Sequence, residues 1–85
     1  MEKPIREEAI EFKEDGKVLG RLLYRKGNGS FEILSTYVDP AARGRGIAGI
    51  LMEMALDQAK EPGLKIVSRC PYASAYLDKR GIKHG

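Results

Sequence analysis

The chain has 85 residues and a formal net charge of +3, with 42% hydrophobic and 32% charged residues. This length suffices for one small core, so residues 1–85 are expected to form a single domain. The chain has no run of the roughly 18–20 apolar residues that a bilayer-spanning helix needs, and its N-terminus does not resemble a signal peptide. Cys70 is the only cysteine, which excludes an internal disulfide. These features favour a cytoplasmic domain.

The first part of the chain predicts an antiparallel meander of three strands. Apolar and polar residues alternate at the end of residues 5–14, and Asp15-Gly16 follows as a strong hairpin signal. A second strand is expected over 17–25, where Gly20 indicates a bulge or a close crossing by another element. The β-branched and aromatic residues of 30–38, which come after a second glycine-containing turn, predict the third strand.

The period of the pattern then changes to that of a helix with one buried face. The apolar positions of that face are Ile47, Ile50, Leu51, Met54 and Ala55. Its outer face is expected to carry Glu53, Asp57 and Lys60. Pro62-Gly63 should end the helix.

Two further elements complete the expected α+β architecture. Residues 64–68 predict a fourth strand. Because a crossover helix precedes it, this strand should run parallel to the third. A short final helix is expected over 72–80, with Gly81 as its cap.

A glycine-rich loop between the third strand and the long helix predicts an anion-binding site. Glycines let backbone N–H groups approach an anion closely, and the unpaired N–H groups of a first helical turn point at it. Arg43 and Arg45 add charge suited to phosphate oxygens. The loop lacks the Gly-Lys-Ser/Thr ending of a Walker motif. Its G-x-G-x-x-G spacing follows an antiparallel meander instead of opening a dinucleotide fold, and a glycine-rich helix start without a ligand stays an alternative.

The segment Arg43-Gly44-Arg45-Gly46-Ile47-Ala48 resembles a motif of the GNAT acetyltransferase superfamily, in which Arg or Gln precedes two spaced small residues. The preceding Tyr37-Val38-Asp39-Pro40 is similar to the strand end and turn found there, and the run from Cys70 to Ile82 resembles the second landmark of the family. The resemblance implies a minimal GNAT-like fold, in which the fourth strand splays from the third, and acetyl-CoA or CoA as the cofactor.

The resemblance also implies how the cofactor is held. Thr36 and Val38 would pair their backbone groups with the pantetheine arm, in the gap between the third and fourth strands. The pyrophosphate would lie on backbone amides of the loop, which are those of Arg43, Gly44, Arg45, Gly46, Ile47, Ala48 and Gly49.

Catalytic roles are less well matched by the sequence. The tyrosine that serves as general acid in the family aligns with Leu77, whereas Tyr76 lies one position away, or about 100° of helix rotation, and Tyr72 one turn earlier. Cys70 replaces the asparagine of the family at a strand end. A thiolate at a helix N-terminus could accept the acetyl group, although a small buried cysteine is also common in cores.

Glu32 is the remaining candidate for a general base, or else an exposed strand residue, and His84 is expected to lie in a disordered tail. The early helices that build an acceptor pocket in larger family members have no counterpart here. The acceptor site would therefore be open, be supplied by a partner protein or a second copy, or not exist.

Three functions follow from this reading. The first is an acyltransferase that moves acetyl from acetyl-CoA to an amine or thiol, and the second is a non-catalytic module that binds CoA or acetyl-CoA. The third, a small basic nucleic-acid binder, lacks a groove-reading helix and an interleaved aromatic and basic face. No membrane partner and no metal are expected.

Overall fold

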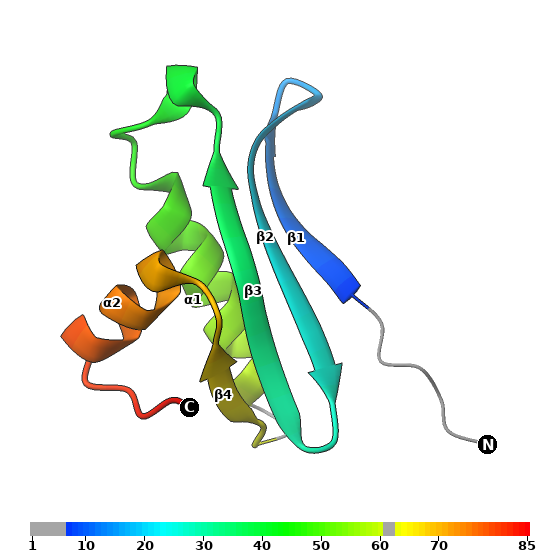
Figure 1. Ribbon diagram of the computed structural model, residues 1–85. Coiled ribbons are helices and arrows are strands. Elements are labelled where there is room, and N and C mark those ends of the chain that lie inside the picture. The colour runs from blue at the N-terminus through cyan, green and yellow to red at the C-terminus, as the bar shows by residue number, and fades with distance from the viewer. Residues whose placement is uncertain (1–6, 61–62) are drawn as a thin grey trace.

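A computed structural model describes residues 7–60 and 63–85 of the chain. Its four strands form one sheet in the order β1-β2-β3-β4, with bounds β1 Glu7–Glu14, β2 Lys17–Gly27, β3 Ser30–Val38 and β4 Lys65–Ser68. A 3-10 helix at Pro40–Ala42, helix α1 at Ile47–Lys60 and helix α2 at Pro71–Lys79 complete the fold (Figure 1). The predicted α+β architecture is confirmed. Residues 5 and 6 of the first expected strand, and Pro62, lie outside the described residues.

The pairing of the strands also follows the prediction. β1 and β2, like β2 and β3, are antiparallel, and β3 and β4 are parallel. Both hairpins turn on a residue pair with positive φ, which is 52° and 77° at Asp15-Gly16 and 52° and 76° at Asn28-Gly29. Such turns match the right-handed twist of the strands that they join.

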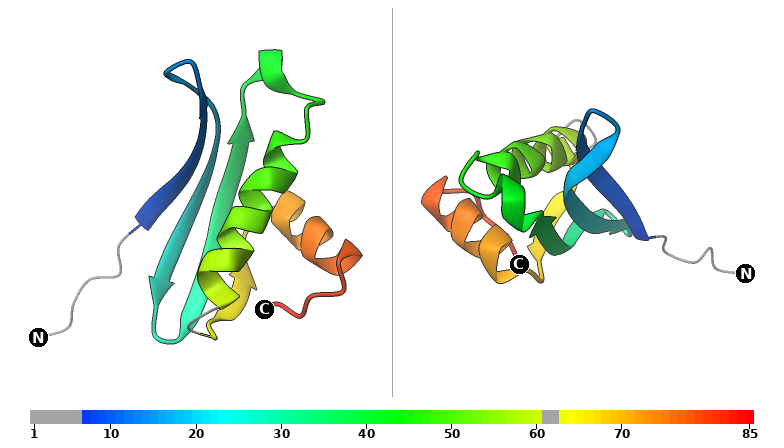
Figure 2. Two further views of the ribbon diagram at one scale, coloured as in Figure 1. Left: turned by 180° about the vertical axis from the view of Figure 1, so that it is seen from behind. Right: turned by 90° about the horizontal axis from the view of Figure 1, so that it is seen from above.

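Both helices pack on the same side of the sheet. α1 lies behind β3 in Figure 1 and contacts β1, β2 and β3, and α2 lies beside β4, as Figure 2 also shows. The fully buried large side chains between the layers are Phe31, Leu22, Ile33, Leu51, Met52 and Leu77. The opposite face of the sheet bears charged side chains, such as Arg21, which bonds Glu11 at 2.8 Å. Within the described residues, no helix is long and apolar enough to cross a membrane.

The buried face of α1 is rotated relative to the predicted one. Ile50 and Met54, expected in the core, are 43% and 40% exposed, whereas Met52 and Ala59 are buried. Glu53, expected on the outer face, is half-buried and bonds residues of α2. The prediction was wrong here because α1 contacts two neighbours, the sheet and α2, and periodicity alone places only one apolar stripe.

The expectation of a disordered tail at His84 is also wrong. The N–H of Gly85 donates to the carbonyl of Ile66 at 2.9 Å, and its carbonyl accepts from the N–H of Ser68 at 3.2 Å, which is the pattern of a parallel bridge. His84 itself contacts Asp78, with 2.8 Å between Nε2 and Oδ1. The tail after α2 is therefore fastened to the outer edge of β4.

Gly20 permits the closest approach of α1 to the sheet. The register between β1 and β2 shifts beside it, where Phe12 pairs with Gly20 and Lys13 with Val18. A Cβ built at position 20 would lie 2.7 Å from Cγ2 of Ile47, the first residue of α1. The predicted bulge and the predicted close crossing are both present.

We therefore expect Gly20→Ala to destabilise the fold by about 1–3 kcal/mol, the usual cost of overpacking a filled core. Chemical denaturation measures this difference. Lys26→Ala, at an exposed position of the same strand, is the control and should change the free energy of unfolding by less than about 0.5 kcal/mol. Equal stability of Gly20→Ala and the parent protein would contradict the close packing.

Candidate functional site

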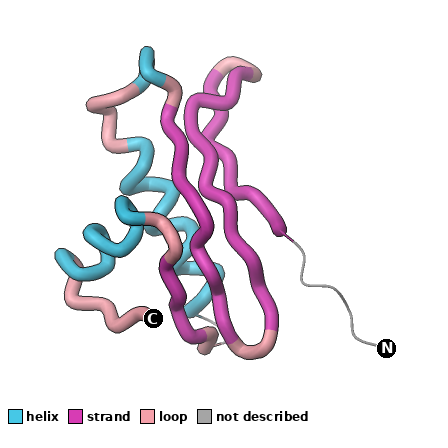
Figure 3. Tube along the Cα trace, viewed as in Figure 1, coloured by secondary structure: helices cyan, strands magenta, loops and turns pink. Residues whose placement is uncertain are grey.

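β3 and the edge strand β4 part about halfway along β3. Their pairing runs from Ser30 and Lys65 to Ile33 and Ser68, and the last bond is donated by the N–H of Arg69 to the carbonyl of Ile33 at 2.8 Å. β3 then continues to Val38, whereas the segment after β4 turns away from β3 into α2 (Figure 3). The second half of β3 therefore borders a gap instead of a strand.

A bulge in β3 decides which backbone groups face this gap. Tyr24 pairs with Ile33 and Leu23 with Ser35, so Leu34 is one extra residue on β3. The carbonyl of Ile33 faces β4, and in a regular strand the residues two and four positions later would face the same way. The extra residue shifts this alternation by one position, to Thr36 and Val38.

The hydrogen bonds at the end of β3 agree with that shift. The N–H of Asp39 donates to the carbonyl of Leu19 on β2 at 2.8 Å. The Val38 carbonyl belongs to the same trans peptide unit and so points away from β2, toward the gap. The structure thus directs backbone groups of Thr36 and Val38 into the gap, as expected from the resemblance.

The glycine-rich loop forms the upper end of the gap. Gly44 and Gly46 have φ of 88° and 78°, the left-handed region that side chains disfavour. The first intrahelical bond of α1 is donated by Ile50 to Gly46 at 3.1 Å. The three amides before it, those of Ile47, Ala48 and Gly49, therefore have no acceptor within the helix. They form a cluster of donors at the positive end of the helix dipole.

A hollow of about 210 Å³ lies over these donors. Its lining consists of Val38, Ala42, Arg43, Gly44, Gly46, Ile47, Ala48, Gly49 and Tyr72. Larger hollows of about 690 and 450 Å³ lie at the end of α2 and between α1 and β4, away from the loop. Only the smallest of the three combines a surface recess with main-chain donors, which is the combination that an anionic ligand requires.

The two arginines of the loop have different partners. Arg45 forms a forked pair with Glu14 of β1, at 2.7 and 3.2 Å, which raises the pKa of Arg45 and lowers that of Glu14. Arg43 donates through Nε to the carbonyl of Val38 at 3.4 Å. Arg45 thus ties the loop to the first hairpin, and Arg43 lines the hollow.

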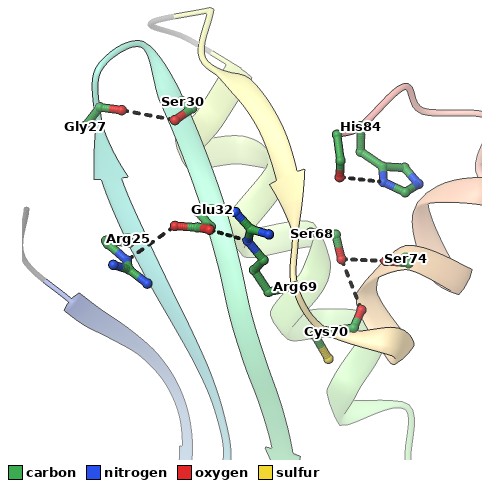
Figure 4. Close-up of polar contacts among 10 residues, drawn as sticks. Arg25, Gly27, Ser30, Glu32, Ser68, Arg69, Cys70, Ser74 and His84 are labelled. Carbon is green, nitrogen blue, oxygen red and sulfur yellow. Dashed lines mark hydrogen bonds and ion pairs between the residues drawn. The ribbon is translucent and has the colours of Figure 1, made fainter.

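Cys70 lies at the start of α2, just after the chain has left β4. It is buried at 7% exposure, and its sulfur lies 3.5 Å from Oγ1 of Thr36 across the gap. Two serines fix its backbone: Ser68 Oγ donates to the Cys70 carbonyl at 3.0 Å, and Ser74 Oγ donates to Ser68 Oγ at 2.8 Å (Figure 4). Cys70, a candidate from the sequence, is thus held beside Thr36 of β3, which the sequence also indicated.

The surroundings of the Cys70 sulfur stabilise a thiolate. Burial by itself raises the pKa of this thiol, but the hydrogen bond with the Thr36 side chain and the nearby backbone N–H groups of Ala73, Tyr72 and Thr36 outweigh it, and the net pKa is lowered. The sulfur is therefore at the N-terminus of a second helix, with donors from both sides of the gap.

Tyr72 and Tyr76 of α2 have different surroundings, and Tyr72 is the one that lines the hollow. The Tyr76 hydroxyl donates to Glu53 of α1, which also accepts from Arg80, so this hydroxyl is engaged in a contact between the two helices. Tyr72 lines the hollow, and its pKa is raised by burial and by the charge of Cys70. Sequence analysis favoured Tyr76 because it adjoins the aligned position at Leu77, which is buried. Tyr72 lies one helical turn before Tyr76 and so on the same side of α2, and this spacing was the sequence signal for Tyr72.

Glu32 is paired with two arginines on the open face of the sheet. Oε1 lies 3.3 Å from Nε of Arg25, and Oε2 accepts from Nε of Arg69 at 2.6 Å (Figure 4). The bond from Arg69, with the charge of Arg25, lowers the pKa of this carboxyl despite some desolvation. Such a carboxylate holds a proton poorly and so is a weak general base.

The sequence profile of the family described as GCN5-related N-acetyl-transferase matches residues 9–82, which is most of the chain. The chain therefore belongs to the GNAT superfamily. The splayed parallel strands and the loop between β3 and α1 agree with this assignment. No curated protein sequence matches the chain significantly.

Solved structures share the fold. An acetyltransferase from Bacillus cereus ATCC 14579 is 26% identical with a TM-score of 0.66, over 74% of this chain and 46% of that one. The ribosomal-protein-alanine N-acetyltransferase from Brucella melitensis biovar Abortus 2308 is 22% identical with a TM-score of 0.74, over 93% and 65%. A protein from Agrobacterium tumefaciens is 28% identical with a TM-score of 0.67, over 91% and 59%. The chain thus spans less than two thirds of each of these structures.

The loop geometry predicts unequal effects of three glycine substitutions. Gly44→Ala and Gly46→Ala should each lower the free energy of unfolding by about 1–2 kcal/mol, the cost of a side chain in the left-handed region. Gly49→Ala is the matched control. Its Cβ would lie 3.7 Å from Tyr76 Cε2, an ordinary contact, and alanine favours a helix, so its stability should be unchanged or higher. Thermal unfolding checks this order, and equal losses for all three variants would contradict it.

Proposed function

We propose that the chain binds acetyl-CoA along the gap and transfers its acetyl group to an amine or thiol acceptor. The observation that carries this proposal is the junction of two features. Backbone groups of Thr36 and Val38 face the gap, and the free amides of the first turn of α1 lie at its upper end. A ligand with an amide-rich arm and a diphosphate is complementary to both features.

The residues at the upper end of the gap fit a diphosphate. Ile47, Ala48, Gly49 and Ile50 form a first helical turn without a carboxylate, so the donors there face no competing negative charge. At Gly44 and Gly46 a Cβ would meet nothing within 4 Å, so the space above these residues is open to phosphate oxygens. The diphosphate would accept bonds from the amides of residues 43–49, and Arg43 would add one charge-assisted contact.

The thioester of bound acetyl-CoA supplies an activated acetyl group. An acceptor amine would attack its carbonyl carbon, the carbon–sulfur bond would break, and the CoA sulfur would leave with the bonding electrons while the amine nitrogen loses a proton. Because the arm would run from the loop back along β3, the sulfur end would come near Thr36 and Cys70. The donors gathered around the Cys70 sulfur are placed to stabilise negative charge there.

A route through Cys70 is the alternative order of events. In it the Cys70 thiolate attacks the acetyl carbon, CoA leaves as a thiolate, and the acetyl-cysteine then delivers its acetyl group to the acceptor. The lowered pKa of Cys70 and its fixed backbone support this role. Tyr72 is the tyrosine closest to this chemistry, and it would donate or hold a proton at the sulfur.

A second function, binding of acetyl-CoA without turnover, is favoured by one specific observation. Tyr76, the tyrosine next to the general-acid position of the family, donates its hydroxyl to Glu53 and not toward the gap. Under this reading residues 1–85 form a single binding domain, and Cys70 is a packing residue. Measurements of turnover separate the two functions.

We expect acetyl-CoA to shift the amide signals of residues 36–49 and of Cys70 in a heteronuclear titration of the whole chain. Gly46→Val should weaken binding about tenfold, because it distorts the loop and fills the space above it. Gly29→Val is the matched control, since Gly29 also has a positive φ, of 76°, but lies in the far hairpin. Shifts confined to β1 and β2, or equal losses in both variants, would count against the site.

Incubation with acetyl-CoA is expected to add one acetyl group to the chain at Cys70, seen by mass spectrometry and absent in Cys70→Ser. Since its pKa is lowered, the rate of addition should rise with pH through a midpoint below that of an ordinary thiol. N-acetylcysteine provides the reference midpoint. Acetylation of an added amine by Cys70→Ser would establish direct transfer, and no transfer to any amine or thiol would leave the binding module.

A further inference from the structure

The open face of the sheet carries a three-residue cluster at the point where β3 and β4 part. Glu32 uses one carboxylate oxygen for Arg25 of β2 and the other for Arg69, which directly follows β4. Glu32 lies between Phe31 and Ile33, both fully buried under the helices, so alternation along β3 places it on the opposite face. Figure 4 shows the three side chains in front of the sheet, with Cys70 directly after Arg69 in the chain.

This arginine cluster, Arg25, Glu32 and Arg69, has an excess of positive charge and spare donors. The contact recorded between each guanidinium group and the carboxylate is made through Nε, and among the described residues neither arginine donates a hydrogen bond from its terminal nitrogens. The Arg69 side chain is 67% exposed and that of Arg25 is 38% exposed. Each arginine contacts a different oxygen of the carboxylate, so the two guanidinium groups flank Glu32, one from the β2 side of β3 and one from the β4 side. This arrangement presents a fork of donors to a second anion.

The cluster lies on the face of the sheet that α1 and α2 leave uncovered within the described fold. α1 and α2 cover the other face of the sheet, and the cofactor arm would fill the gap from the loop (Figure 2). Ile33, at the vertex, is three residues from Thr36, which is roughly 10 Å along the strand. An acceptor anchored at the cluster therefore has its reactive end within reach of Thr36 and Cys70.

We propose that the acceptor is an amine that also carries a carboxylate, which docks on the terminal N–H groups of Arg25 and Arg69 on the open face of the sheet. This proposal rests on the proposed acetyl transfer and names its substrate class. Glu32 holds both guanidinium groups through its two oxygens and is a positioning residue. Phosphate shares the same chemistry of recognition, so the test compares both anions.

The first measurement reads the cluster without turnover. The Nε–Hε signals of Arg25 and Arg69 are followed by NMR while succinate, inorganic phosphate or chloride is added to the whole chain at constant ionic strength. We expect succinate to shift both signals more than chloride does. Arg69→Gln should weaken succinate binding about fivefold, and Lys65→Gln should leave it unchanged. Lys65 is the matched control because it removes the same charge from the far end of β4.

The second measurement reads the acceptor. Release of free CoA thiol is followed with two amidated peptides, Ala-Gly-Asp and Ala-Gly-Asn, which differ only in the carboxylate. We expect about fivefold faster acetylation of the acidic peptide, a preference that Arg69→Gln abolishes and Arg69→Lys partly restores. A loss of folding alone would lower both rates equally, and the thermal unfolding of each variant is compared with that of Lys65→Gln to identify it.

The outcomes separate this inference from the function on which it rests. If CoA binds but succinate shifts neither arginine, or if both peptides react equally, the acceptor class is overturned and the cofactor site stands. If phosphate shifts the signals and succinate does not, the carboxylate is overturned in favour of a phosphorylated acceptor. If succinate binds at the arginines but acetyl-CoA shifts no signal of the loop, the anion site stands and acetyl transfer fails.

Discussion

The rest of the site depends on the end of one parallel pairing. After the bond between Arg69 and Ile33, β4 has no further residues in the sheet, while β3 continues to Val38. The bulge at Leu34 then directs backbone groups of Thr36 and Val38 into the space that β4 has left. A strand edge is normally a hazard because its donors and acceptors are unpaired. Here that edge is recessed between a loop and a helix, and in the proposed function it pairs with the cofactor arm instead of with another strand.

Two helix N-termini converge on this space, and they act on different charges. The first turn of α1 offers amides of Ile47, Ala48 and Gly49 at the outer end, where a diphosphate would lie. The first turn of α2 offers amides of Tyr72 and Ala73 at the inner end, around the Cys70 sulfur. Both ends are therefore electropositive without a metal or a buried lysine in the proposed scheme. The surface arginines add charge at the margins, where solvent screens it.

Much of the fold was predictable because it depends on local signals. The Asp15-Gly16 turn, the change of period at Ile47 and the glycine at 81, whose φ is 70°, all act within a few residues. The loop was found in the same way. The errors concern side chains whose positions depend on residues far away in the sequence. Ile50 was predicted in the core, because periodicity does not show how α2 packs on α1. His84 was predicted in a disordered tail, because periodicity does not show the bridge from Gly85 to β4. The roles of Tyr72, Glu32 and Arg69 likewise depend on contacts between segments far apart in the chain.

The bridge between Gly85 and β4 bears on how copies of this protein would meet. An uncovered strand margin invites a neighbouring molecule to extend the sheet, and the short β4 is the margin least defended by its own side chains. The returning tail occupies the main-chain groups of Ile66 and Ser68 there. At the other margin, β1 bears Glu7, Glu8, Lys13 and Glu14 on its surface. Crowded solutions of the folded chain should therefore resist growth of intermolecular β-structure, even though the sheet has one face without helices.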